Sequence, residues 1–253
     1  MTSQMTSQPR HENSGRELSP FGATARRHPG RWEFWKFNWL IHHRMIAALE
    51  RASAHASGTL LDVGCGSRPF EPLFQGRITR AFGTDLARSP YLGDRRPDAF
   101  ARAEALPVRS GAIDTVLATS MLTCLPEPSA MLREVHRVLR PGGVAILEFE
   151  QMIPVHDEPH DYFRFTRFGA AHLLESAGLE PVEFIPVGGL MSKVGMSLIG
   201  WLNRVNRGPT RILTEIPVRI LYVVLQLGFA LLDRLFFDPR EVMAHIVVAR
   251  RKR

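Results

Sequence analysis

The stretch LLDVGCG, residues 60–66, decides the fold of this chain. It completes a short apolar segment and then places two glycines, Gly64 and Gly66, two positions apart. Glycine permits a positive φ and lets a ligand approach the backbone where a side chain would collide. Such a turn after a buried strand is typical of the carboxyl edge of an open parallel sheet, where ligands bind.

The segments on either side of this turn alternate between strand and helix patterns. We expect strands at 59–63, 81–86, 99–103, 114–119, 144–149, 179–187 and 241–250, and helices at 31–53, 129–139 and 167–177. A turn of proline and glycine at 140–143 ends the helix before the fifth strand. Short apolar strands separated by helices predict an α/β, Rossmann-like, mostly parallel sheet covered by helices on both faces.

An acid follows the glycine turn at the spacing that nucleoside cofactors require. Asp85 ends the second predicted strand, about twenty residues on, where a carboxylate can accept hydrogen bonds from both ribose hydroxyls. A dinucleotide fingerprint needs a third glycine at position 69, which is Pro69 here, so an NAD-linked dehydrogenase is disfavoured. The P-loop spacing with its lysine is also missing, which disfavours an ATPase.

Four spaced motifs carry a resemblance to a known family. LLDVGCG, GTDL (83–86), AEALPVRSGAIDTVLA (103–118) and LREVHRVLRPGG (132–143) resemble class I S-adenosylmethionine-dependent methyltransferases of the type 11 group. The resemblance runs from about residue 58 to 148. It implies a seven-stranded sheet with the last strand antiparallel, and S-adenosyl-L-methionine as cofactor.

The resemblance also implies which residues bind the cofactor. It places Asp62, Gly64, Cys65 and Gly66 on the turn that holds the methionine moiety and the ribose, Asp85 with Leu86 at the ribose hydroxyls, Ala103 and Glu104 at the adenine edge, and Thr119 beneath the sulfonium. Two positions depart from the pattern: many members have glycine where Arg68 stands, and often aspartate where Arg102 stands. These departures keep a second class open, a cofactor-binding protein of this fold without transferase activity.

The polar stretch HDEPHDYFRFT, residues 156–166, follows the fifth predicted strand. We expect it to form a wall beside the methyl acceptor, with His156, His160 and Asp157 as candidate catalytic residues, because an oxygen or nitrogen acceptor needs its proton removed. The alternative is a polar loop held by its own hydrogen bonds. Pro159, between the two histidines, argues against a regular helix that presents both to a metal, so no metal site is predicted.

An apolar helical insertion at 188–240 precedes the last strand. Residues 220–232 are apolar on nearly all helical faces, and charged residues bracket this run, which is too short to span a bilayer comfortably. One interpretation is a cap on the substrate cleft or a homodimer face through 194–237. The other is monotopic attachment to an anionic membrane surface, with Arg204, Arg207 and Arg211 near headgroups. Both favour a large acceptor, lipid-linked or glycan-like, over a small metabolite.

Composition sets broader limits. A formal charge of +7 favours anionic partners, but no zinc-finger spacing or ribonucleoprotein motif is present, so nucleic acid is disfavoured. The two cysteines predict no disulfide framework and favour the cytoplasm, or the inner face of the membrane if the insertion binds lipid. We expect a disordered arm at 1–30 and one domain at 31–253, made of an N-terminal helix (31–57), a cofactor-binding core (58–187), the insertion (188–240), and the last strand with a basic tail (241–253).

Overall fold

A seven-stranded sheet forms the centre of the protein. The computed structural model describes residues 38–93, 95–206 and 211–252, with only the backbone at 211–214. The strands are β1 (Gly58–Val63), β2 (Ile78–Asp85), β3 (Ala99–Phe100), β4 (Ile113–Ala118), β5 (Leu139–Glu150), β6 (Leu179–Val187) and β7 (Ala244–Arg251), in the order β3-β2-β1-β4-β5-β7-β6. β7 is antiparallel to both of its neighbours, and the pairs among β1 to β5 are parallel. The predicted Rossmann-like sheet is confirmed.

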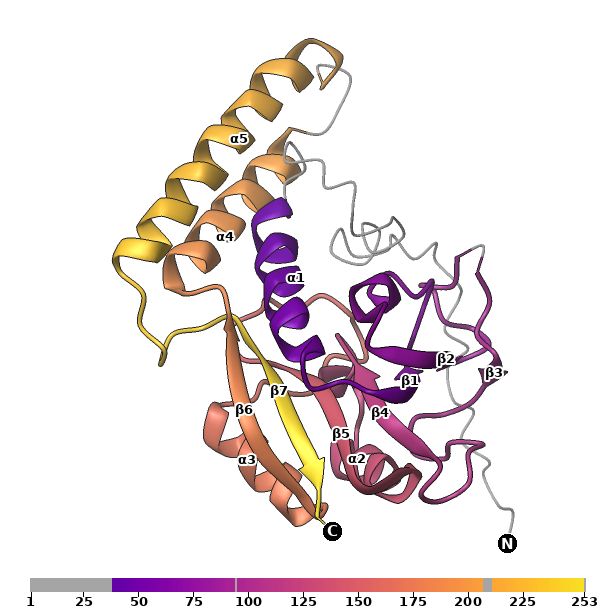
Figure 1. Cartoon of the computed structure of the whole chain (residues 1–253). Coiled ribbons are helices and arrows are strands. Elements are labelled where there is room, and N and C mark those ends of the chain that lie inside the picture. Colours follow the sequence, from indigo (N-terminus) through magenta and orange to yellow (C-terminus); the bar gives the residue numbers. More distant parts are fainter. Residues whose placement is uncertain (1–37, 94, 207–210, 253) are drawn as a thin grey trace, which may run out of the picture.

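Helices cover both faces of the sheet (Figure 1). The helices are α1 (Trp39–Ser53), α2 (Pro128–Val138), α3 (Arg167–Ser176), α4 (Leu190–Val205) and α5 (Arg211–Leu235), with short 3-10 helices η1 (Glu71–Phe74) and η2 (Leu122–Cys124). α2 and α3 bury Leu132, Val135 and Leu174 against one face, and α1 buries Leu49 and Ala52 against the other. The alternation of strand side chains supplies both cores, because successive residues point to opposite faces.

The structure corrects several predicted boundaries. β5 begins at Leu139 rather than at 144, because Leu139 pairs with Ile113 before the register jumps to Thr115 and Val144. Residues 140–143 bulge out between those pairs, with Gly142 at φ +79°. β3 holds two residues instead of the predicted 99–103, β2 begins at Ile78, and β7 begins at Ala244 rather than at 241.

The N-terminal predictions fall partly outside the described residues. Helix α1 is described from Trp39, within the predicted helix 31–53, whereas the arm at 1–30 and residues 31–37 lie outside. The glycine turn after β1 leads into the 3-10 helix η1 rather than into an α-helix. That connection lacks the helix start on which dinucleotide folds hold a pyrophosphate.

The strand order places the site. From β1 the chain runs outward to β2 and β3, and then returns to the other side of β1 as β4. The carboxyl ends of β1 and β4 therefore form the topological switch point, outside which ligands bind in sheets of this kind. The glycine turn after β1 and Thr119 after β4 both lie at this edge.

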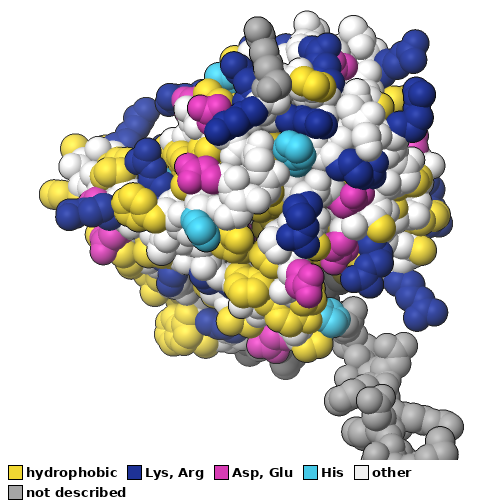
Figure 2. Space-filling view, turned by 90° about the horizontal axis from the view of Figure 1, so that it is seen from below, with side chains coloured by type: hydrophobic (Ala, Val, Ile, Leu, Met, Phe, Trp, Pro, Cys, Tyr) yellow, Lys and Arg dark blue, Asp and Glu magenta, His cyan; other side chains and the backbone are white. Residues whose placement is uncertain are grey.

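The predicted insertion forms a helical hairpin that extends from the sheet at the end of β6 (Figure 1). α4 and α5 pack along each other, and α1 lies beside their base. At the opposite end of the molecule, Lys and Arg side chains are scattered among acidic and apolar ones (Figure 2). Positive charge is dispersed over this face. That the protein does not bind nucleic acid stays a prediction.

Candidate functional site at the carboxyl ends of β1, β4 and β5

The glycine turn has a backbone that only glycine adopts without strain. Gly64 has φ +73° and Gly66 has φ +49°. The backbone N–H groups of Gly64 and Cys65 donate to the Thr84 carbonyl, at 2.8 and 3.1 Å, which fixes the turn to β2. A Cβ on Gly64 would lie 2.9 Å from the Met121 sulfur, and one on Gly66 would lie 3.1 Å from the backbone oxygen of Tyr91. The turn therefore requires glycine for its φ angles and for its close neighbours.

Asp85 closes the floor of the site at the end of β2. Its Oδ2 accepts a hydrogen bond from the backbone N–H of Gly66 at 2.7 Å, and its Oδ1 accepts one from Leu86 at 2.6 Å. The carboxylate is buried, yet each oxygen keeps further lone pairs for donors from a ligand. Asp85 thus joins the turn after β1 to the end of β2 and presents an acceptor at the switch point.

The side chains of Asp62, on β1, and of Cys65, within the turn, are both buried. Burial raises the pKa of Asp62 to about 8, against the opposing effect of the nearby Arg68 guanidinium. Burial likewise raises the pKa of the Cys65 thiol to about 12, so it stays neutral at physiological pH. Its sulfur would lie 2.6 Å from a Cβ on Gly83, which marks it as a tightly packed small side chain.

The two arginines that depart from the family pattern have different surroundings. Arg68, in the left-handed region at φ 58°, is buried and pairs with Asp98 at 2.5 Å; Asp98 in turn accepts from the Gly83 N–H at 2.7 Å. It ties the segment before β3 to the turn. Arg102 is exposed and pairs with Glu104 at 3.2 Å, beside the buried Ala103.

Two carboxylates on β5 complete the edge, and both are buried. Glu148 accepts from the backbone N–H and the hydroxyl of Ser120, at 2.7 and 3.0 Å, and Ser120 follows β4 with φ +51°. Glu150 lies two residues further along, so both side chains point to the same face of the sheet. Burial raises the pKa of both carboxyl groups above the ordinary range, and nearby carboxylates add to it: Glu150 for Glu148, and Asp161 with Asp157 for Glu150. Strained backbone and two raised pKa values at one edge are typical of functional sites.

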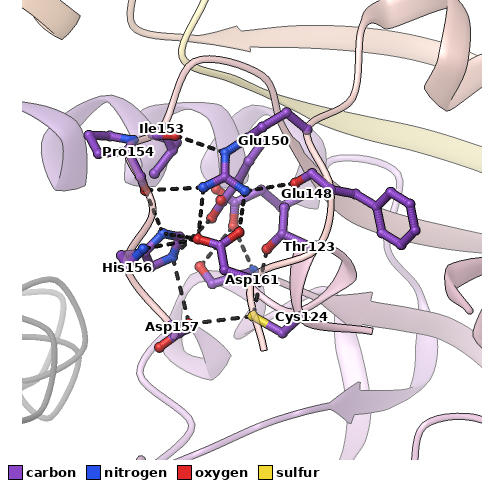
Figure 3. A network of polar contacts seen from close by, with 12 residues as sticks. Thr123, Cys124, Glu148, Glu150, Ile153, Pro154, His156, Asp157 and Asp161 are labelled. Atoms are coloured by element: carbon purple, nitrogen blue, oxygen red, sulfur yellow. Dashed lines mark hydrogen bonds and ion pairs between the residues drawn. The ribbon is translucent and has the colours of Figure 1, made fainter. Parts of the chain in front are cut away.

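The loop after β5 folds back over Glu150 (Figure 3). His156 is nearly buried, with its Nε2 3.8 Å from Glu150 Oε1 and 3.7 Å from Asp157 Oδ2. Asp157 accepts from the Tyr91 hydroxyl at 2.5 Å and from the Cys124 thiol at 3.4 Å. The Tyr91 contact joins the β2–β3 connection to the loop after β5, across the edge of the sheet.

Arg164 holds this loop in place. Its guanidinium pairs with Asp161 and donates to the carbonyls of Ile153 and Pro154, at 2.8 and 3.1 Å. The paired guanidinium lowers the pKa of Asp161 to about 2. Asp161 also accepts from the His156 N–H at 2.9 Å, so the charged pair fixes the position of that histidine.

The three candidate catalytic residues from the sequence do not stay together. His156 and Asp157 lie in the cluster around Glu150, whereas the exposed His160 contacts the Tyr162 hydroxyl at 3.1 Å. In the described part of the chain, no group of three His, Cys, Asp or Glu side chains could hold a metal ion. Of the three aromatic residues in this stretch, Tyr162 and Phe163 are about half exposed and Phe165 is buried.

Comparisons with known proteins agree with this geometry. A family profile described as "Methyltransferase domain" matches residues 61–147, from β1 through β5. Residues 61–147 match the methyltransferase domain of the class I, S-adenosylmethionine-dependent family.

Two relatives and one solved structure show the extent of the likeness. An uncharacterized chloroplastic methyltransferase of Arabidopsis thaliana is 30% identical over 44% of this chain and 34% of its own length. A ubiquinone biosynthesis O-methyltransferase of Pseudomonas paraeruginosa is 26% identical over 63% of this chain and 70% of its own. The protein solved in complex with the Haloferax volcanii Trm112 methyltransferase activator is 19% identical, with a TM-score of 0.56 over 92% of this chain and 96% of that one. The chain thus spans about a third of the Arabidopsis relative.

The methyltransferase domain has the donors and acceptors that S-adenosyl-L-methionine requires. The two glycines carry no side chain and so let a ligand approach the backbone of the turn, and Asp85 supplies a buried carboxylate for ribose hydroxyls. Burial raises the pKa of Asp62 to about 8. The positive charge of the cofactor, bound beside it, would favour the ionised form of this carboxyl group. Thr119 is half-buried after β4, and Ala103 and Glu104 form the wall after β3. These residues fit the cofactor, and the two departures from the family pattern are the buried Arg68 and the exposed Arg102.

The sequence patterns missed Glu148, Glu150 and Tyr91. A signal for the first two was present: two carboxylates stand two positions apart in an otherwise apolar strand, VAILEFE, residues 144–150. Buried acids need a partner or a raised pKa, so their presence in a central strand indicates a site. Nothing local marked Tyr91, which reaches Asp157 only through the fold.

The raised pKa of Asp62 predicts a stability that falls with pH. The folded protein holds a proton up to about pH 8, whereas an unfolded aspartate loses it near pH 4, so the unfolded state binds fewer protons between these values. The free energy of unfolding should decrease across this window, by up to about 1.4 kcal/mol per pH unit, and level off above it. Urea unfolding of the cofactor-free protein at several pH values would measure this.

Asp62→Asn should flatten the decrease, because the amide does not titrate. The matched control is Asp238→Asn, a partly exposed carboxylate paired with Arg240, which lowers its pKa to about 2, well below this window. An equal pH slope in Asp62→Asn and the unmodified chain would contradict the assignment.

Proposed function

We propose that this chain transfers a methyl group from S-adenosyl-L-methionine to an oxygen or nitrogen of an acceptor held at the carboxyl ends of β4 and β5. When bound, the cofactor supplies an electrophilic methyl group on a good leaving group. The protein then needs to align the acceptor and accept its proton. The family profile and the relatives support the transferase class.

One observation carries the mechanism: Glu150 is a buried carboxylate with an unused acceptor oxygen. Its Oε2 is buried and finds no hydrogen-bond partner among the described residues. Burial raises the pKa of this carboxyl group, which brings it toward the pH at which a general base works best. We assign to Glu150 the acceptance of the proton from the acceptor.

The neighbours of Glu150 hold it in a defined state. His156, 3.8 Å away, lies between Glu150 and Asp157 and can stabilise a negative charge on either carboxylate. The Arg164 guanidinium opposes the effect of burial and lowers the pKa of Glu150, and the Thr123 hydroxyl acts in the same direction. His156 and Asp157 are then positioning residues for the base. The predicted catalytic role of His160 is tested separately, by His160→Ala.

The acceptor proposed here is a lipid-linked or glycan-like molecule. The name of the Pseudomonas relative places O-methylation in ubiquinone biosynthesis, which is in keeping with an oxygen acceptor. Support for a lipid-linked acceptor comes from the exposed apolar side chains of α4 and α5. These two helices follow β6 at the same edge of the sheet as the site, so an apolar surface lies at that edge.

Calorimetry and turnover together test the proposal. We expect saturable binding of S-adenosyl-L-methionine and of S-adenosylhomocysteine to the full chain. We also expect release of S-adenosylhomocysteine when a bacterial lipid extract or a polysaccharide fraction is added with the cofactor. The extract that supports turnover identifies the acceptor class, and the fraction without turnover serves as its control. Failure of both cofactors to bind at high micromolar concentration would refute the proposal.

The alternative, a cofactor-binding protein without transferase activity, is favoured by Arg102. Its exposed guanidinium pairs with Glu104. At the position of Arg102 the family often has an aspartate. On this alternative both cofactors bind, and no extract releases S-adenosylhomocysteine. The two measurements therefore separate the transferase, the non-catalytic binder and a chain that has kept only the fold.

A further inference from the structure

Helices α4 and α5 form an arm whose outer surface is apolar. We call residues 190–205 and 211–235 the apolar arm. Within it, Glu215–Leu235 is a 21-residue helical stretch long and apolar enough to cross a membrane, and only 11% of its most apolar window is buried in the protein. A core helix of a globular protein would be mostly buried, so this surface calls for another environment.

The base of the arm is locked to the methyltransferase domain. Asp233, which is buried on α5, accepts hydrogen bonds from the N–H of Gly189 at 3.0 Å and from the hydroxyl of Ser192 at 2.7 Å. Arg44 of α1 lies 3.7 Å from the same carboxylate, and the N–H of Leu40 donates to Gln226 at 3.0 Å. The arm is therefore held at a fixed place on the domain.

The exposed side chains lie in regular rows along both helices. On α5, the exposed apolar residues at spacings of three and four are Ile216, Ile220, Val224, Leu227, Leu231 and Leu235. On α4 the row is Val194, Leu198, Trp201 and Val205. Between Arg219 and Asp233 the sequence has no charged residue. Each helix thus buries one face against the protein and presents an uncharged apolar row outward.

Charge indicates what covers these rows. Residues 190–214 contain Lys193, Arg204, Arg207 and Arg211 and no acid. A second copy of this chain would bring like charges together at the interface, whereas anionic headgroups would complement them. Trp201, about half exposed on α4, is a residue type that favours the headgroup layer.

Length decides how the arm meets a bilayer. α4 has 16 residues, or about 24 Å at 1.5 Å per residue, whereas the hydrocarbon core is about 30 Å thick. α5 packs along α4, with Gly195 directly against the Phe229 ring, so the two helices must enter lipid together. Because α4 is shorter than the hydrocarbon core, the two helices do not cross as a spanning pair, and the in-plane arrangement buries the apolar rows while Arg204 stays at headgroup level.

We propose that the apolar arm binds in the plane of an anionic membrane surface and holds the methyltransferase domain there. β6 ends at Val187 and α4 begins at Leu190, so the arm leaves from the sheet edge that carries Glu150 and the glycine turn. Membrane binding through the arm brings that edge toward the headgroups. This binding is independent of the proposed function, because lipid association is measured without turnover.

Vesicle flotation of the full chain tests the proposal. We expect the protein to float with phosphatidylcholine–phosphatidylglycerol vesicles, to float less with phosphatidylcholine alone, and to lose part of its binding at high salt. Leu227→Glu with Leu231→Glu places two charges in the exposed row of α5. This double variant should weaken the partition coefficient by at least about tenfold.

The matched control is Phe168→Glu, which adds a glutamate at a side chain 84% exposed on α3, outside the arm. It should float like the unmodified chain, and circular dichroism with cofactor titration checks that all variants are folded. Equal flotation of the double variant and the unmodified chain would overturn the proposal. So would a lipid-free dimer in sedimentation equilibrium that the double variant dissociates, because a second copy would then cover the arm.

Discussion

Glu150→Gln should lower kcat for methyl transfer by about 10²- to 10⁴-fold, the range that general base catalysis contributes, while the affinity for S-adenosyl-L-methionine stays unchanged. Glutamine keeps the volume of the side chain but does not accept a proton at neutral pH. Its amide also fills the place of the carboxylate oxygen that lacks a partner among the described residues. Single-turnover kinetics with the acceptor extract would measure the loss, and calorimetry would measure cofactor binding.

The pH dependence distinguishes a base from a structural carboxylate. Because burial raises the pKa of Glu150, kcat should rise with pH as this group ionises and then level off. Glu150→Asp keeps a carboxylate at a changed distance and should recover part of the activity with a similar pH profile. A carboxylate with a merely structural role would give neither this pH profile of kcat nor a recovery of activity in Glu150→Asp.

The matched control for this prediction is Glu180→Gln, the same chemical change at an exposed carboxylate on β6. It should leave kcat as it is. Unchanged turnover in Glu150→Gln would exclude Glu150 as the base. The histidines would then be the candidates for the base, tested by His156→Ala and His160→Ala. Of these two, His156→Ala should cost more, because only His156 lies within 4 Å of Glu150.

Asp85→Ala should weaken binding of S-adenosylhomocysteine by about 10- to 100-fold, the cost of losing hydrogen bonds to a charged acceptor. The change removes the carboxylate proposed to accept from the ribose. It also leaves the N–H of Gly66 without its 2.7 Å acceptor, which loosens the turn itself. Calorimetric titration of the two proteins would give the ratio of dissociation constants directly.

Asp238→Ala is the control for the second prediction, since that carboxylate lies in a loop and pairs only locally, with Arg240. Thermal unfolding should show that Asp85→Ala remains folded. A dissociation constant equal to that of the unmodified chain would contradict the placement of the cofactor at the end of β2. The two substitutions also separate the steps: Glu150→Gln loses turnover alone, whereas Asp85→Ala loses binding first.

Local pattern predicted the glycine turn and the acid at the end of the second strand. The apolar run before Gly64 and the acid at Asp85 are properties of short segments, and the structure places both at the switch point of a parallel sheet. The boundaries were less certain for a physical reason. Leu139 joins β5 because a partner strand offers Ile113, and β3 shrinks to two residues because only Ala99 and Phe100 find partners on β2.

The polar loop after β5 was predicted only in outline. HDEPHDYFRFT was placed at the correct edge, but its histidines were indistinguishable in the sequence. The fold separates them: Arg164 and Asp161 hold His156 against Glu150, and His160 stays at the surface. Tyr91 lies more than sixty residues before its partner Asp157, so no local pattern could have joined them.

The sequence by itself determined the sheet, the glycine turn and a nucleoside cofactor, because each depends on residue type and spacing along a few neighbouring residues, and the family resemblance specified S-adenosyl-L-methionine. Only the tertiary structure decided which polar groups share a site, since Glu150, His156 and Tyr91 meet through strand order and loop path. It also decided the character of the apolar insertion. Hydrophobic composition allowed burial in protein or in lipid, and the outward rows on α4 and α5 show that the protein itself leaves that surface uncovered.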